Sequence, residues 1–118
     1  MPRVVIHGKP VPKARPRKGK HGWYTPTAKH EDWVAMHFVR HRNLYREGPV
    51  LVACAFYMNA RQKADTDNCV KLVRDAMQKA GVFADDVQVT RGYDERHIVP
   101  NGQEHTVVWF SRPNEVGM

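Results

Sequence analysis

The segment between Asp67 and Gly81 constrains the fold more than any other, because its polar and apolar side chains separate onto opposite faces of a helix. At about 100° per residue, one arc is wholly apolar and the opposite arc is wholly polar. The apolar arc comprises Cys69, Val70, Leu72, Val73, Ala76, Met77 and Ala80, and the polar arc comprises Asp67, Asn68, Lys71, Arg74, Asp75, Gln78 and Lys79. A carboxylate at Asp67 can cap or favour the helix N-terminus, and Gly81 is placed as a C-terminal cap. The pattern predicts an amphipathic helix that lies on a core.

Several other segments have the composition of β-strands. One of them, Val50–Met58, is a nearly continuous apolar run, which indicates a central strand covered on both faces. The remaining strands are predicted at Arg3–His7, at Gln103–Phe110, and at Val87–Arg91 with a possible extension toward Val99.

Turn and cap signals complete the outline. Thr25-Pro26 predicts the start of a second helix, which is expected to run to about Arg46 and to stop at Gly48-Pro49. Asn101-Gly102 is a hairpin signal before the last strand.

These elements predict an α+β protein, a single compact domain over residues 1–118 in which a mixed sheet of about four strands packs with two main helices. No stretch approaches the ~20 apolar residues of a membrane span, and the N-terminus lacks the apolar core of a signal peptide. Cys54 and Cys69 stand in apolar surroundings without a CxxC pair, which indicates buried free thiols in a reducing cytoplasm. We therefore expect a cytoplasmic protein with no membrane partner.

The charge of the chain is strongly basic and unevenly spread. The net charge of +7 favours a polyanionic partner, with nucleic acid first and an anionic membrane second. The first thirty residues contain no acid, and prolines and glycines make Gly8–Gly22 an extended, mobile loop. Trp23 and Tyr24 end this loop with rings that can either dock on the body or stack on a base. The loop carries the basic residues Lys9, Lys13, Arg15, Arg17, Lys18 and Lys20.

Five of the twelve acids are aspartates between Asp65 and Asp86. Asp67, Lys71 and Asp75 share one helix face. If the strand that follows Asp86 pairs beside Val50–Met58, its beginning can approach the start of the helix. Two carboxylates about 4 Å apart repel by roughly 4 kcal/mol at an effective dielectric near 20, so a proton or a cation must lie between them.

Hard oxygen ligands of this kind suit Mg²⁺ or Mn²⁺, and no Cys/His set has convincing zinc spacing. A divalent metal among aspartates suits phosphoryl transfer, in which Lys71 can contact the phosphate or stabilise developing charge. Each aspartate alone is explained as well by a helix cap or a solvated turn, and Lys71 by pairing with Asp67 and Asp75. The set as a whole favours a metal-dependent nuclease.

The aspartate region follows a recognisable pattern: Asp65-Thr-Asp67-Asn68, then Lys71, then Asp75-Ala, then Gly81, then Asp85-Asp86-Val-Gln-Val89. Upstream stand Gly8-Lys-Pro-Val-Pro-Lys13-Ala-Arg15-Pro-Arg17 and Tyr24-Thr-Pro26. Together these segments resemble the RusA family of Holliday junction resolvases, the crossover junction endodeoxyribonucleases. The chain departs at Lys63-Ala64, where some members carry basic residues directly before the first aspartate.

The resemblance implies a symmetric homodimer, bacterial or phage-encoded, that cleaves four-way DNA junctions by paired incisions with Mg²⁺ or Mn²⁺, in recombination and repair. It implies that Asp65, Asp67 and Asp86 bind the metal and that Lys71 is catalytic. The basic loop then gains a role in binding DNA phosphates, through Lys13, Arg15, Arg17, Lys18 and Lys20. Two alternatives stay open: a nuclease for a broader range of branched DNA, and a non-catalytic junction-binding module.

Overall fold

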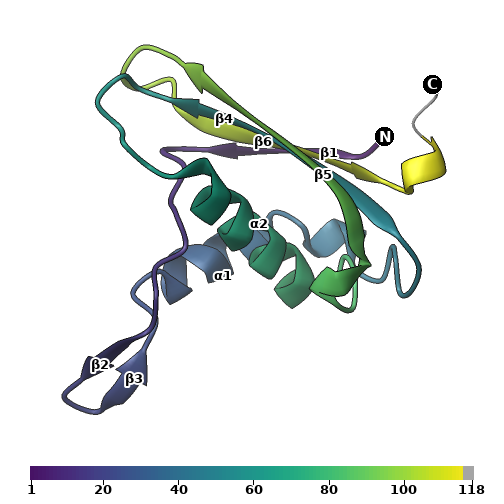
Figure 1. The fold of residues 1–118 in the computed structure, drawn as a ribbon, viewed down its shortest axis with the longest axis horizontal. Coiled ribbons are helices and arrows are strands. Elements are labelled where there is room, and N and C mark those ends of the chain that lie inside the picture. The colour runs from purple at the N-terminus through teal and green to yellow at the C-terminus, as the bar shows by residue number, and fades with distance from the viewer. Residues whose placement is uncertain (116–118) are drawn as a thin grey trace.

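A four-stranded mixed sheet forms the centre of the computed structural model, which describes residues 1–115 (Figure 1). Its strands are β1 (Arg3–His7), β4 (Val50–Met58), β5 (Val89–Ile98) and β6 (His105–Ser111), in the spatial order β1-β6-β4-β5. β4 pairs with β6 antiparallel and with β5 parallel. The expected α+β class, mixed sheet and central position of Val50–Met58 are confirmed. The last three residues of the expected 1–118 domain lie outside the described residues.

Both α-helices lie on one face of the sheet (Figure 1). They are α1 (Ala28–Met36) and α2 (Thr66–Ala80). The apolar arc predicted for α2 supplies its buried residues Cys69, Leu72, Val73, Ala76, Met77 and Ala80. Fully burying one Leu or Met side chain contributes about 1.5–3 kcal/mol, so packing holds this helix more firmly than its intrinsic propensity does. None of the described helices is long and apolar enough to cross a membrane.

The ends of α2 are fixed by its neighbouring residues. Asp65 is the N-cap, and its side chain accepts a hydrogen bond from the backbone N–H of Asp67 at 2.9 Å. The capping carboxylate is therefore that of Asp65, and not that of Asp67 as the sequence suggested. Gly81 caps the C-terminus in the left-handed conformation with φ of 82°, as expected.

The core lies between the helices and the sheet, and both cysteines are part of it. Cys54 and Cys69 are free and buried, which confirms the prediction of buried free thiols. Burial raises the pKa of the Cys54 thiol to about 12 and that of Cys69 to about 11. Both thiols therefore stay protonated and unreactive at neutral pH.

The expected helix from Thr25-Pro26 to Arg46 is wrong in its length. α1 ends at Met36, and a short 3₁₀ turn, Val39–His41, follows. Asn43 then adopts a positive φ of 62°, and its N–H donates to the carbonyl of Gly81. The Tyr45 N–H also donates to the Val82 carbonyl, and Tyr45 forms a β-bridge with Phe83, so this segment pairs with the chain that follows α2 instead of continuing the helix.

The expected hairpin at Asn101-Gly102 is also wrong. A turn occurs there, with Gly102 at φ of 95°, but β5 and β6 are not neighbours because β4 lies between them. The connection crosses the end of β4 instead. β5 is thereby left as an edge strand, and nine of its ten residues are exposed.

Candidate active site

Asp65, the N-cap of α2, and Asp67 and Lys71 in its first two turns lie at the same end of the helix, and all three are exposed. The helix dipole and the unsatisfied N–H groups of this end favour negative charge. The alternative explanation of Lys71, pairing with Asp67 or Asp75, is not what the structure contains: among residues 1–115, Lys71 forms no ion pair. Asp75 pairs instead with Lys13 at 3.2 Å. The N-terminal end of α2 thus presents two carboxylates and one ammonium group toward solvent.

The linker between β4 and α2 holds Asp65 in place. The Asn59 side-chain oxygen accepts hydrogen bonds from the N–H groups of Arg61 and Gln62, at 2.9 and 3.0 Å. The Arg96 guanidinium of β5 donates to the carbonyls of Gln62 and Ala64, at 2.6 and 3.2 Å. These bonds attach the last linker residue before Asp65 to the edge of the sheet.

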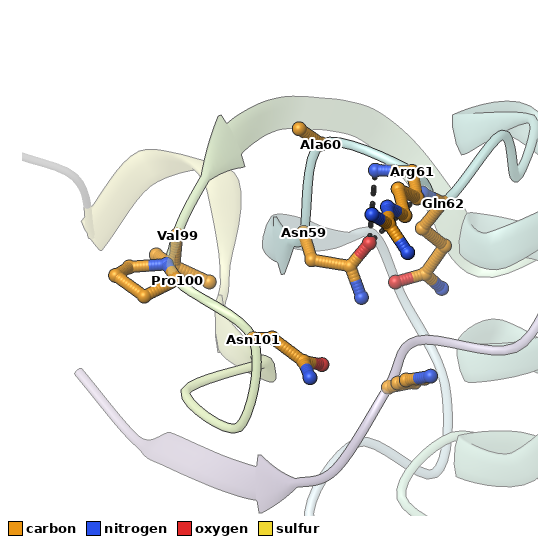
Figure 2. A pocket seen from close by; sticks show the side chains of 8 residues that line it. Asn59, Ala60, Arg61, Gln62, Val99, Pro100 and Asn101 are labelled. Atoms are coloured by element: carbon orange, nitrogen blue, oxygen red, sulfur yellow. Dashed lines mark hydrogen bonds between the residues drawn. The ribbon is translucent and has the colours of Figure 1, made fainter.

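A cleft of about 640 Å³ lies beside this linker (Figure 2). Figure 2 shows the linker residues on one side and the β5–β6 connection on the other. The Asn59 side-chain amide donates to the Glu104 carboxylate at 3.0 Å, so the floor of this region is tied to the start of β6. The lining residues are Lys9, Asn59, Ala60, Arg61, Gln62, Val99, Pro100 and Asn101.

Asp86 lies at the opposite end of α2. Its backbone N–H donates to the side-chain oxygen of Gln78 at 2.9 Å, and Gln78 is about 17 Å along the helix axis from Asp67. The predicted pairing of the following strand with Val50–Met58 is confirmed, but it is parallel. In a strand–helix–strand unit with parallel strands, the helix runs back between them, so the second strand begins near the helix C-terminus. The expectation that this strand begins near the start of the helix is therefore wrong.

Gln88 holds Asp86 at this end. The Gln88 side-chain oxygen accepts from the N–H groups of Ala84 and Asp85, and its amide donates to the carbonyls of Tyr45 and Gly48, each at 3.1 Å. Asp85 caps the short 3₁₀ turn Asp86–Gln88. The sequence contained a signal for this role, the Asp-Asp-x-Gln order, but periodicity alone gives Gln88 no function.

A third ligand is therefore missing from each end of α2 within one chain. In the part of the chain that the structure describes, no three His, Cys, Asp or Glu side chains are placed to hold a metal ion together. Asp65 and Asp67 supply two hard carboxylates, which fits Mg²⁺ or Mn²⁺ in donor type but not in number. The assignment of Asp65, Asp67, Asp86 and Lys71 to the site stays a prediction.

Lys13, at the base of the basic loop, is bound to the body. Its ammonium pairs with Glu31 of α1 and with Asp75 of α2. Glu31 is 5% exposed and also pairs with Lys79 at 2.8 Å. Burial alone would raise the pKa of Glu31, but the hydrogen bonds from Lys13 and Lys79 outweigh it and hold the pKa below its ordinary value. No sequence pattern indicated a buried acid at Glu31, because its partners are distant along the chain.

Beyond Lys13, the loop forms a small antiparallel hairpin of β2 (Arg17–Gly19) and β3 (Gly22–Tyr24). The hairpin projects away from the sheet and helices (Figure 1). The loop is thus more ordered than expected for an extended, mobile segment. The remaining candidate DNA-binding residues are all exposed on it: Arg15, Arg17, Lys18 and Lys20.

The family model for the endodeoxyribonuclease RusA matches residues 7–107 of this chain. The match covers most of the 118 residues, from the end of β1 into β6, and so includes the basic hairpin and both ends of α2. No curated protein matches the chain.

Proposed function

The chain belongs to the RusA family of endodeoxyribonucleases, which implies resolution of Holliday junctions, and from this premise we propose that it does so with Mg²⁺ or Mn²⁺ in DNA recombination and repair. The observation that carries the proposal is the N-terminal end of α2. There, Asp65 and Asp67 are exposed carboxylates that form no ion pair among residues 1–115, and the ammonium of Lys71, one turn beyond Asp67, likewise pairs with no acid among these residues. We propose that the enzyme acts in the cytoplasm, where its two thiols would stay reduced.

The proposed metal site is shared between two copies of the chain. Asp65 and Asp67 of one protomer would bind the ion together with Asp86 of the partner subunit. When two α2 helices lie antiparallel about a two-fold axis, the C-terminal end of each comes beside the N-terminal end of the other. The exposed edge of β5 lies next to α2 and supports this arrangement, because its unpaired backbone groups are available to a second chain.

Each residue of the site has a proposed task. The three aspartates would hold a divalent ion, which would supply a water of lowered pKa and offset negative charge on the phosphate. Lys71 stabilises the negative charge that develops on the phosphate oxygens. The exposed cations of the hairpin bind DNA phosphates and so orient the strand, and two-fold symmetry provides one site for each of the paired incisions.

The direct test is cleavage of a synthetic four-way junction with Mg²⁺ or Mn²⁺. Asp67→Asn should lower the single-turnover rate by about 100- to 1,000-fold, the range found when a charge-stabilising group is removed. Asp32→Asn is the matched control, because Asp32 is an exposed aspartate on α1 whose partner is Lys79. Equal rates for Asp67→Asn and the parent would refute the site.

A mixing experiment tests the shared site. Asp67→Asn and Asp86→Asn chains, each inactive alone, should form mixed dimers with one intact site and should nick one strand of the junction. If the three aspartates act within one chain, the mixture stays inactive even when subunit exchange is demonstrated by differently tagged chains.

Substrate range is tested by comparing rates on four-way junctions, forks and flaps. Equal rates on all three would indicate the broader branched-DNA nuclease. Tight junction binding without cleavage under any divalent metal would indicate a non-catalytic binding module.

A further inference from the structure

Trp23 is the most exposed aromatic side chain of the described residues, at 72%. It lies on β3 of the hairpin that projects from the body, so no other element covers it (Figure 1). Trp33 on α1 provides a contrast, because its ring lies 5.4 Å from His30 and 4.6 Å from His37. Trp23 makes no such ring contact with residues 1–115. The structure therefore excludes docking on the body, one of the two roles that the sequence allowed for this ring.

The two faces of the hairpin differ. Arg17 pairs with Tyr24 and Lys18 pairs with Trp23 across the strands, so each face carries one cation and one aromatic ring. The Tyr24 ring covers Gly19 so closely that a Cβ at that glycine would lie 2.9 Å from it. Tyr24 thus packs on the hairpin's own backbone, whereas the face of Trp23 and Lys18 is open.

The base of the hairpin is anchored close to the candidate active site. The Lys13 N–H donates to the Asn68 carbonyl in the first turn of α2, at 2.9 Å. The Ala14 N–H bonds the Thr27 hydroxyl at 3.3 Å, just before α1. From Lys13 to Lys18 the chain can span at most about 17 Å, which equals roughly five nucleotide steps of a DNA strand. A DNA strand bound at Asp65 and Asp67 would therefore reach the open face within a few nucleotides.

An exposed indole beside an exposed ammonium is suited to one nucleotide: the ring stacks on a base and the cation meets its phosphate. In a fully paired duplex the base faces are stacked on each other, so the indole reaches a base only where pairing is interrupted. We propose that Trp23 and Lys18 form a binding site for an unpaired or splayed nucleotide of the branched DNA substrate. This inference rests on the proposed function for the presence of branched DNA.

The test measures binding in EDTA, so that no cleavage step is involved. The probes are a four-way junction, a single-stranded oligonucleotide and a linear duplex of the same length. Trp23→Ala should weaken binding to the junction and the single strand by about 10-fold, the size expected for the loss of one base stack, and binding to the duplex by less than about 2-fold. Trp33→Ala, an exposed tryptophan on α1, is the matched control and should leave all three affinities unchanged.

Two further variants separate stacking from other contacts. Trp23→Phe should keep part of the DNA affinity that Trp23→Ala loses, whereas Trp23→Leu should not, since only phenylalanine keeps an aromatic face. Tryptophan fluorescence of the parent should be quenched by the single strand, and the quenching should disappear in Trp23→Phe.

Several results would overturn the inference. These are unchanged junction affinity in Trp23→Ala, an equal loss for duplex and junction, or equal affinities of the phenylalanine and leucine variants. Failure of the parent chain to bind any of the three DNAs would instead overturn the proposed function, so the two failures are distinguishable.

Discussion

Two charged regions of α2 use the same residue types with opposite outcomes. In the second half of the helix, Asp75 and Lys79 belong to a cluster with Glu31 and Lys13, in which every charge has an opposite partner within the chain. At the N-terminal end, Asp65, Asp67 and Lys71 have no such ion-pair partners among residues 1–115. The first group joins α1, α2 and the basic loop, whereas the second is exposed and is the one that we propose for the metal site. A carboxylate on a helix therefore indicates function only when its charge is not compensated by the chain itself.

The largest expected effect on this comparison comes from Lys71→Ala. Its ammonium forms no ion pair among residues 1–115, so its removal should leave the fold and junction binding intact while junction cleavage falls by about 100- to 1,000-fold. The paired lysine should behave differently: Lys79→Ala should leave the cleavage rate unchanged and lower stability. Single-turnover kinetics measure the cleavage rates and urea unfolding measures the stabilities. A slower cleavage rate in Lys79→Ala, with a loss of stability alone in Lys71→Ala, would contradict the distinction between the paired and the unpaired lysine.

Glu31→Gln should have the largest effect on stability. Breaking a buried ion pair typically costs about 3–5 kcal/mol, and the retained pairs of Lys13 with Asp75 and Lys79 with Asp32 should reduce this to about 2–3 kcal/mol. Urea unfolding gives the free energy directly. The exposed control Asp32→Asn should change it by less than about 1 kcal/mol. A loss in Glu31→Gln no larger than in that control would show that the cluster does not hold the helices together.

The same cluster should make stability depend on pH in the acid range. The folded pKa of Glu31 lies below the ordinary value of 4.5, so its contribution is fully present above that value and is lost as pH falls through the folded pKa. The difference in unfolding free energy between the parent and Glu31→Gln should therefore shrink as pH is lowered from about 6 to 3. A difference that stays constant over this range would show that the carboxylate charge is not what stabilises the cluster.

Asp65 belongs to both sides of the comparison, because it caps α2 and is also a candidate ligand. Asp65→Ala should lower the unfolding free energy by about 1 kcal/mol through loss of the cap, and Asp65→Ser should not, since serine is itself a good N-cap. Both variants should lose junction cleavage. Cleavage retained in Asp65→Ser would assign the residue to the helix alone.

The elements predicted correctly from sequence are those with a local cause. The polar and apolar arcs of α2 and the left-handed Gly81 follow from residues that are neighbours along the chain. The segment after α1 was mispredicted because the backbone at Asn43 and Tyr45 pairs with Gly81 and Val82, which are distant along the chain. Strand order was mispredicted at Asn101-Gly102 for the same reason, since pairing with β4 decides it and not the turn.

The candidate site divides in the same way. The proximity of Asp65, Asp67 and Lys71 follows from helical spacing, and the structure places them as that spacing predicts. The position of Asp86 depends on whether β5 is parallel or antiparallel to β4, which local spacing does not contain. Glu31 gave no signal, because Lys13 and Lys79 approach it only in the folded chain.

The length of α2 fixes the distance between the residues at its two ends. Asp67 and Asp86 are held at its two ends, so their separation is set by the number of residues between them. One inserted residue would lengthen the helix by about 1.5 Å and rotate everything after it by about 100°, which would turn Met77 and Ala80 away from the core. Only insertions near a whole turn, in steps of about 5.4 Å, keep the buried stripe in register. The spacing between these two aspartates can therefore change in evolution by jumps and not by gradual adjustment.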